Sequence, residues 1–93
     1  MLEKLKISDD CILQTRQVGE ELKHYLFNIV SGDCFELNEV SWFILDSILK
    51  GNDMRSIEDF ILAEFGGCNI AQVRVDVHDF IDQCILSGIL IKA

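Results

Sequence analysis

The chain has 93 residues, is 49 % hydrophobic and contains no proline, which excludes a disordered protein and predicts one domain spanning residues 1–93. Sixteen acidic residues against eight basic ones give a formal net charge of −8. Nucleic-acid binding depends on Lys and Arg that neutralise phosphates, so this charge argues against it. No window approaches the roughly 20 apolar residues of a membrane helix, and charges interrupt the N-terminal MLEKLKISDD, so we expect a cytoplasmic protein.

The cysteines predict neither a metal centre nor a cofactor. Cys11, Cys34, Cys68 and Cys84 are separated by wide, irregular intervals with no C-x-x-C pair, and the two histidines do not stand at metal-ligand spacing from them. In a cytoplasmic chain the simplest interpretation is four free thiols that serve as small hydrophobic side chains. A zinc site assembled from distant positions stays open as an alternative.

The first half of the chain has the period-two pattern of antiparallel strands. Residues 11–18 form the first expected strand, which Gly19-Glu20-Glu21 ends, and residues 22–30 form the second. Ser31-Gly32-Asp33 has the composition of a tight hairpin, because Gly tolerates positive φ and Asp bonds to its own backbone. A short third strand, residues 34–37, follows.

The alternation also assigns faces to these strands. Tyr25, Phe27 and Ile29 share one face of the second strand. In the third strand Phe35 and Leu37 are expected to point inward, with Cys34 and Glu36 outward. Three short antiparallel strands are not stable alone, so helices must cover one face of the sheet.

The first expected helix spans residues 38–50. Asn38 is a good N-cap, Glu39 suits the positive end of the helix, and Lys50-Gly51 ends it. The apolar residues of FELNEVSWFILDSILKG cover more than half of the helix circumference. This breadth predicts packing against both the sheet and other helices.

Two more helices complete the chain. The second, residues 56–66, is expected to start at a Ser56 cap with Asp59 as its capping-box partner and to stop at Gly66-Gly67. The third, residues 70–88, is expected to start near Asn69, with Gln72 as a box partner, and to end at Gly88. Apolar residues recur along it at helical spacing: Ile70, Val73, Val77, Phe80, Ile81 and Cys84.

A three-stranded antiparallel sheet followed by three helices predicts an α+β, winged-helix-turn-helix-like fold. Such domains often bind DNA through their third helix. Here that helix carries Asp76, Asp79 and Asp82 against the single base Arg74, so the ligand must be something other than DNA.

Catalytic motifs are missing from the sequence. Gly66-Gly67 is not followed by the Lys-Ser or Lys-Thr of a phosphate-binding loop, and no Ser or Cys has a nucleophile setting. Asp76, His78 and Asp79 form the densest polar cluster, but residues one or two apart on a helix point to different faces. We therefore expect a protein that is not an enzyme.

Three ordered segments resemble the PqqD family of pyrroloquinoline-quinone biosynthesis: LNEVSWFILDSILKG (Leu37–Gly51), SIEDFILAEFG (Ser56–Gly66) and DVHDFIDQCILSGIL (Asp76–Leu90). The family pattern has Leu-Asn-Glu opening the first helix, a Gly ending it, a Ser- or Thr-led second helix, and Asp-Val-x-x-Phe with a terminal Gly-hydrophobic-Leu. Two departures affect packing: Val40-Ser41-Trp42 replaces small residues, and Cys84 replaces the usual Leu.

The resemblance implies a non-catalytic chaperone that binds the leader of a ribosomally made precursor peptide. Such proteins present the leader to a modifying enzyme, often a radical S-adenosylmethionine enzyme. In the family the leader lies as an extra strand against the third strand, with side chains in a groove beside the third helix, a mode that an exposed strand edge supports.

The resemblance thus implies a set of peptide-binding residues on two elements. Arg74, as the only base on the third helix, could pair with an acidic leader side chain, whereas Asn38 is interpreted as a helix cap. For Phe35, Leu37, Val77 and Ile81, a place in the core is the stronger expectation than contact with the peptide. The candidates are Asp33, Cys34, Phe35, Glu36 and Leu37 on the strand edge, and Val73, Arg74, Val77, His78 and Ile81 on the helix.

Two alternatives belong to other classes. A winged-helix protein-interaction or regulatory domain would use the free strand edge to pair with a second copy, and so act by dimerisation. A small metal-binding or redox protein would use the cysteines. A neighbouring gene for a short precursor peptide would favour leader binding over dimerisation. A metal-content assay would identify a metal-binding or redox protein.

Overall fold

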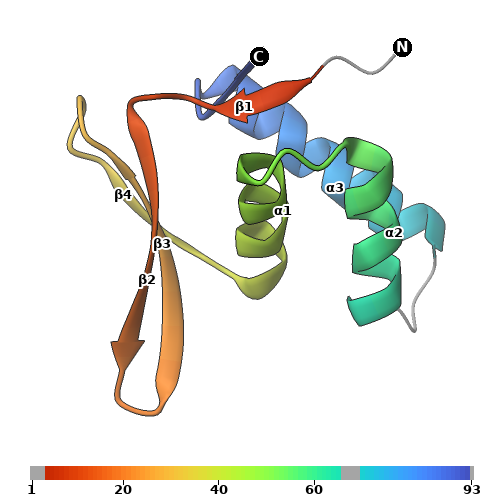
Figure 1. Cartoon of the computed structure of the whole chain (residues 1–93), viewed down its shortest axis with the longest axis horizontal. Coiled ribbons are helices and arrows are strands. Elements are labelled where there is room, and N and C mark those ends of the chain that lie inside the picture. The colour runs from red at the N-terminus through yellow and green to blue at the C-terminus, as the bar shows by residue number, and fades with distance from the viewer. Residues whose placement is uncertain (1–3, 66–69, 93) are drawn as a thin grey trace.

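The computed structural model describes residues 4–65 and 70–92, with eight elements in one chain (Figure 1). Helices gather on one side of the main sheet, and a long hairpin projects past them. In chain order the elements are β1 (Leu5–Ile7), β2 (Cys11–Val18), β3 (Glu21–Asn28), β4 (Cys34–Leu37), α1 (Glu39–Leu49), α2 (Met54–Phe65), α3 (Ile70–Leu86) and β5 (Leu90–Lys92).

The main sheet has the order β2-β3-β4, antiparallel throughout, so the prediction of a three-stranded antiparallel sheet followed by three helices is confirmed. The bounds of β2 and β4 agree with those predicted. The second strand ends at Asn28 rather than at residue 30, because the Asn28 side chain accepts hydrogen bonds from the amides of Val30 and Ser31 and starts the turn there. Gly32, with φ of 80°, completes that turn.

A second, two-stranded sheet was not predicted. β1 pairs antiparallel with β5, with Ile7 opposite Leu90, so the two ends of the described chain lie side by side (Figure 1). Strands of three residues are too short to show a period, which is why the sequence pattern did not reveal them. Ile7 and Leu90 are both buried in the core, where β1 contacts α1 and β5 contacts α3.

The core lies between the inner face of the main sheet and the three helices. On β3 the inward residue is Leu26, only 1 % exposed, so Tyr25 and Phe27 lie on the face turned away from the helices. α1 contributes Ile44, Leu45 and Ile48, and its breadth of buried surface agrees with the predicted contact on two sides. The other buried apolar residues are Cys11, Ile57, Ile61, Val77, Ile81 and Cys84.

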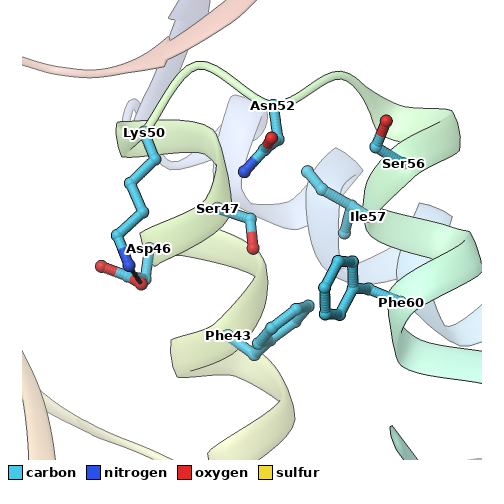
Figure 2. Close-up of a pocket in the computed structure, with 8 residues that line it drawn as sticks. All are labelled: Phe43, Asp46, Ser47, Lys50, Asn52, Ser56, Ile57 and Phe60. Carbon is cyan, nitrogen blue, oxygen red and sulfur yellow. Dashed lines mark ion pairs between the residues drawn. The ribbon is translucent and has the colours of Figure 1, made fainter. Parts of the chain in front are cut away.

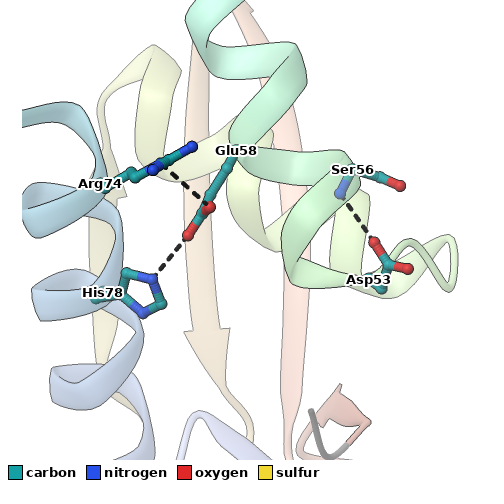
Figure 3. Close-up of polar contacts among 5 residues, drawn as sticks. All are labelled: Asp53, Ser56, Glu58, Arg74 and His78. Atoms are coloured by element: carbon teal, nitrogen blue, oxygen red, sulfur yellow. Dashed lines mark hydrogen bonds and ion pairs between the residues drawn. The ribbon is translucent and has the colours of Figure 1, made fainter. Parts of the chain in front are cut away.

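The start of α2 differs from the prediction. Asp53, not Ser56, caps this helix: its Oδ1 accepts a hydrogen bond from the Ser56 amide at 2.8 Å (Figure 3). This bond is the largest cause of the lowered pKa of Asp53, because the bond favours the charged carboxylate. Asp53 and Ser56 are both of a residue type that caps helices, so the local sequence fitted either one. The helix begins directly after Asp53, the earlier of the two.

The remaining caps follow the sequence closely. Asn38 Oδ1 accepts a hydrogen bond from the Ser41 amide at 2.7 Å, as its interpretation as a cap requires. α3 ends at Leu86, two residues before the predicted limit, and Gly88 with φ of 78° turns the chain toward β5. Asn69 and Gly66-Gly67, the predicted start of the third helix and stop of the second, lie outside the described residues. Among the described helices, none has the length and apolarity needed to cross a bilayer.

Candidate functional site

The outer edge of β4 is open. In the described part of the chain, β4 pairs only with β3, and no backbone hydrogen bond joins residues 34–37 to any other element. The Asn28 amide donates to the Asp33 carbonyl at 2.8 Å, which makes 28 and 33 a hydrogen-bonded pair. Because such pairs alternate along antiparallel strands, Phe35 and Leu37 bond to β3, whereas the N–H and C=O groups of Cys34 and Glu36 point away from the sheet.

An apolar groove runs beside this edge, between the inner face of β4 and α3. We call it the β4–α3 groove; its volume is about 300 Å³. Phe35 is 50 % exposed although it lies on the same face as the buried Leu26, so part of its ring forms the open wall. The lining residues are Leu26, Phe35, Leu37, Leu45, Phe80, Gln83, Cys84, Ser87 and Ile89.

A second hollow, the α1–α3 pocket of about 380 Å³, adjoins the groove because Phe80 lines both. It sits at the N-terminal end of α1 and has one carboxylate, Asp76, whose Oδ1 accepts a hydrogen bond from Gln72 Nε2 at 2.9 Å. The lining residues are Asn38, Val40, Ser41, Ile44, Ile61, Val73, Asp76, Val77 and Phe80. Groove and pocket together leave one open stripe at three- and four-residue spacing, which consists of residues 73, 76, 80 and 83 of α3 and residue 87 directly after it.

Eight of the ten sequence-derived site residues fall into three groups. Phe35 and Leu37 line the β4–α3 groove, and Val73 and Val77 line the α1–α3 pocket. Ile81 is buried in the core. Asp33, Cys34 and Glu36 are exposed along the edge, where Glu36 lies 3.4 Å from Lys23 of β3.

The structure does not bring Arg74 and His78 to this edge. Both reach across to Glu58 of α2: His78 Nε2 lies 2.7 Å from Glu58 Oε1, and Arg74 Nε lies 3.9 Å from Glu58 Oε2 (Figure 3). The Glu58 side chain is only 15 % exposed, so the two side chains join α2 to α3. They lie about half a turn around α3 from the open stripe.

Sequence reasoning did not assign four residues to the groove: Phe80, Gln83 and Cys84 on α3, and Ser87 directly after it. Phe80 and Cys84 were assigned to the apolar stripe of the helix, and both are largely buried. The helical spacing of the apolar residues places the groove positions near one another. It does not tell which flank of the buried stripe borders the sheet, because that depends on the rotation of the helix when it packs.

Another cavity lies on a different side of the molecule, between α1 and α2 (Figure 2). This α1–α2 cleft has a volume of about 410 Å³, and the rings of Phe43 and Phe60 face each other in it with centroids 5.7 Å apart. Lys50 and Asp46 form an ion pair of 2.9 Å on its α1 side. It is separate from the strand edge and shares no lining residue with the β4–α3 groove.

The thiols and carboxylates offer no constellation for metal chemistry within the described residues, where no cluster of three or more His, Cys, Asp or Glu could hold an ion. Cys11 and Cys84 are buried and unbonded, and Cys34 is exposed. Burial raises the pKa of Cys84 to about 11, with a smaller contribution from the nearby Cys11. Burial likewise raises the pKa of Cys11, helped by the charge of Asp10.

The three-stranded sheet with one open edge, backed by three helices, defines a small α+β domain of the winged-helix-like kind. The family model for "Coenzyme PQQ synthesis protein D (PqqD)" matches residues 23–90, and the chain therefore belongs to the PqqD family. A search of curated proteins found no match.

Two solved structures share the fold. One, described as "TbiB1 in Complex with the TbiA(beta) Leader Peptide", is 25 % identical with a TM-score of 0.74, over 91 % of this chain and 93 % of that chain. The other, "Lasso peptide synthetase B1 complexed with the leader peptide", has the same TM-score at 15 % identity, over 95 % of this chain and 98 % of that chain.

Proposed function

We propose that this protein binds the leader of a ribosomally made precursor peptide by strand addition at β4 and presents it to a modifying enzyme, such as a radical S-adenosylmethionine enzyme. The observation that carries the proposal is the open edge of Cys34 and Glu36 beside an apolar groove. An extended peptide gains affinity from main-chain hydrogen bonds to such an edge and specificity from side-chain pockets next to it. Membership of the PqqD family and likeness to two leader-peptide complexes support it.

In this binding mode the guest strand alternates between two surroundings. Residues opposite Cys34 and Glu36 exchange hydrogen bonds with them and place their side chains on the outer face of the sheet. The residues between them turn inward to the β4–α3 groove and, further along α3, to the α1–α3 pocket. The guest side chains that enter these hollows should be apolar, because the walls are mainly Leu, Ile, Val and Phe.

Charge around the hollows favours a guest peptide that is not acidic. Asp76 lines the α1–α3 pocket, and Asp33 and Glu36 are exposed at the edge. Arg74, the base that could have attracted an acidic leader, is held by Glu58 on another side of α3. The binding chemistry is therefore apolar insertion with weak attraction for a basic residue.

The chain itself supplies no reaction in this proposal; the chemistry belongs to the enzyme that receives the peptide. Peptide binding and catalysis are divided between two proteins in this proposal, because a site made of a backbone edge and hydrocarbon walls offers no reacting group. The alternative of dimerisation through the same edge has no specific support in the geometry.

Titration of ¹⁵N-labelled protein with the leader encoded beside its gene tests the proposal. Amide shifts should cluster on residues 34–37 and on Phe80, Gln83, Cys84 and Ser87. A scrambled leader of the same composition is the control and should give no clustered shifts. Shifts confined to the α1–α2 cleft, or none at micromolar peptide, would contradict strand addition at β4.

A further inference from the structure

The face of the main sheet turned away from the helices has an interaction surface of its own. None of the three described helices covers this face (Figure 1), and the strand alternation defines its members. We call it the outer sheet face; it consists of Ile12, Gln14, Arg16 and Val18 on β2, Glu21, Lys23, Tyr25 and Phe27 on β3, and Cys34 and Glu36 on β4.

The centre of this face is aromatic and apolar. Tyr25 and Phe27 lie 6.4 Å apart between ring centroids, with Ile12 directly opposite Phe27. Ile12 is 48 % exposed and Ile29, in the turn next to it, is 63 % exposed. A shallow hollow of about 430 Å³ lies over Ile12, Phe27 and Ile29. Aromatic and aliphatic side chains left in contact with water at this density are typical of a binding surface.

The outer sheet face carries two bases, Arg16 and Lys23, and two carboxylates, Glu21 and Glu36, whereas the whole chain has eight basic and sixteen acidic residues. The Arg16 guanidinium lies 5.9 Å from the centre of the Phe27 ring, and its one hydrogen bond within residues 4–65 and 70–92 goes to Gln14 Oε1, at 3.4 Å. It forms no ion pair with any carboxylate in the described residues. Lys23, by contrast, pairs with Glu36. An arginine that lies over an aromatic ring and pairs with no carboxylate of the described residues is the kind of residue that anchors an interface to a carboxylate of another protein.

The outer sheet face is continuous with the proposed leader strand. The register aligns Ile12, Phe27 and Cys34 in one row across the sheet, and Gln14, Tyr25 and Glu36 in the next. A strand added beside β4 extends both rows by one residue each, because directly opposed residues share a face. A protein seated on this face therefore contacts the sheet and the outward side chains of the leader at once, whereas the groove on the other face holds the leader in place.

We propose that the outer sheet face docks the peptide-modifying enzyme, through apolar contact on Ile12, Tyr25 and Phe27 and through a carboxylate of the enzyme that meets Arg16. This inference rests on the proposed function, since the enzyme is the protein that receives the leader. The occupant is the enzyme rather than a second copy, because two chains of net charge −8 repel each other at long range.

The test measures two affinities for each variant of the full chain: for the fluorescent leader peptide, and for the recombinant modifying enzyme encoded beside the same gene. Arg16→Glu and Ile12→Asn should each weaken enzyme binding at least about tenfold and leave leader affinity within about twofold. Arg55→Glu makes the same charge change at an exposed position of α2, and Leu86→Asn removes an exposed leucine of α3; both should leave enzyme affinity unchanged.

Each outcome decides between the hypotheses. The inference is overturned if Arg16→Glu and Ile12→Asn bind the enzyme as tightly as the wild type does. It is also overturned if Arg55→Glu weakens enzyme binding as much as Arg16→Glu does, or if the enzyme does not bind a wild-type chain that binds the leader. It is also overturned if sedimentation shows a dimer that Arg16→Glu dissociates, since a second copy then occupies the face. Loss of leader binding by a variant of the β4 edge, with enzyme binding by the free chain retained, supports both proposals; leader bound elsewhere contradicts only the proposed function.

Discussion

The imidazole ring of His24 stacks on the indole ring of Trp42, with centroids 4.4 Å apart and planes 7° apart. His24 lies on β3 opposite Leu37, the last residue of β4, and its Nδ1 is 2.8 Å from Thr15 Oγ1 of β2. Trp42 lies in the first turns of α1. The stack therefore fixes the corner at which the open strand turns into the first helix, and so the position of the edge relative to the groove.

Replacing Trp42 by Ala should lower the free energy of unfolding by about 2 kcal/mol, because the half-buried indole loses its packing and its stacking partner. Trp42→Phe keeps a flat ring over His24 and should cost less, about 1 kcal/mol. Urea denaturation followed by circular dichroism measures both values. Equal losses for the two variants would mean that ring stacking does not stabilise this corner.

Placing proline at residue 36 should weaken leader binding about fivefold or more, because the outward N–H of Glu36 is a donor that the guest strand needs. The hydrogen bonds between β4 and β3 are not affected, since Phe35 and Leu37 make them. Glu36→Ala is the matched control: it removes the carboxylate and its pairing with Lys23 but keeps the N–H.

Fluorescence anisotropy with labelled leader gives the affinities, and thermal melts show whether the fold survives. If Glu36→Pro is folded and binds as tightly as Glu36→Ala, the peptide does not add to β4.

Truncation of Phe80 to Ala should reduce leader affinity about tenfold, because this ring forms the wall shared by the β4–α3 groove and the α1–α3 pocket. Phe60→Ala is the control, since Phe60 is more exposed and lines the α1–α2 cleft instead. Calorimetric titration with leader peptide compares the two. A larger loss from Phe60→Ala would move the binding site to the α1–α2 cleft.

Reversal of charge at Arg74 should affect stability rather than binding. Arg74→Glu places a second carboxylate beside Glu58, which also pairs with His78, and should cost about 1 kcal/mol of unfolding free energy. Adding Glu58→Gln should recover part of this loss, because the repulsion is gone. Leader affinity measured on folded protein should stay within about twofold. A selective loss of affinity for an acidic leader would instead return Arg74 to the peptide site.

The thiols should differ sharply in reactivity. In a Cys68→Ser background, iodoacetamide at pH 8 should alkylate the exposed Cys34 well before Cys11 or Cys84. Burial raises the pKa of Cys84 from 9.0 to about 11, so its thiolate is scarce at that pH. The unfolded chain ionises this thiol near pH 9.0 and the folded chain only near 11, so this group makes stability fall as pH rises between those values.

Mass spectrometry of digested peptides gives the alkylation order, and denaturation of Cys84→Ala gives the pH dependence without this thiol. Faster labelling of Cys84 than of Cys34 would show that the core opens more readily than its packing indicates. Bound leader should protect Cys34.

Local chemistry determined much of this protein. The bounds of β2 and β4, the turn at Gly32, the cap at Asn38 and the end of α3 near Gly88 all follow from side chains acting on their own backbone within a few residues. The acidic charge and the missing catalytic motifs also needed no structure.

Only the tertiary structure decided the pairing of β1 with β5, whose residues come from opposite ends of the chain and whose length shows no period. It also decided that Arg74 and His78 face Glu58 whereas Phe80 and Gln83 border the groove. Sequence period tells which residues of a helix share a face. The rotation that turns that face toward a particular neighbour is fixed when all the elements pack together, because the burial of α3 is shared between the sheet and two other helices.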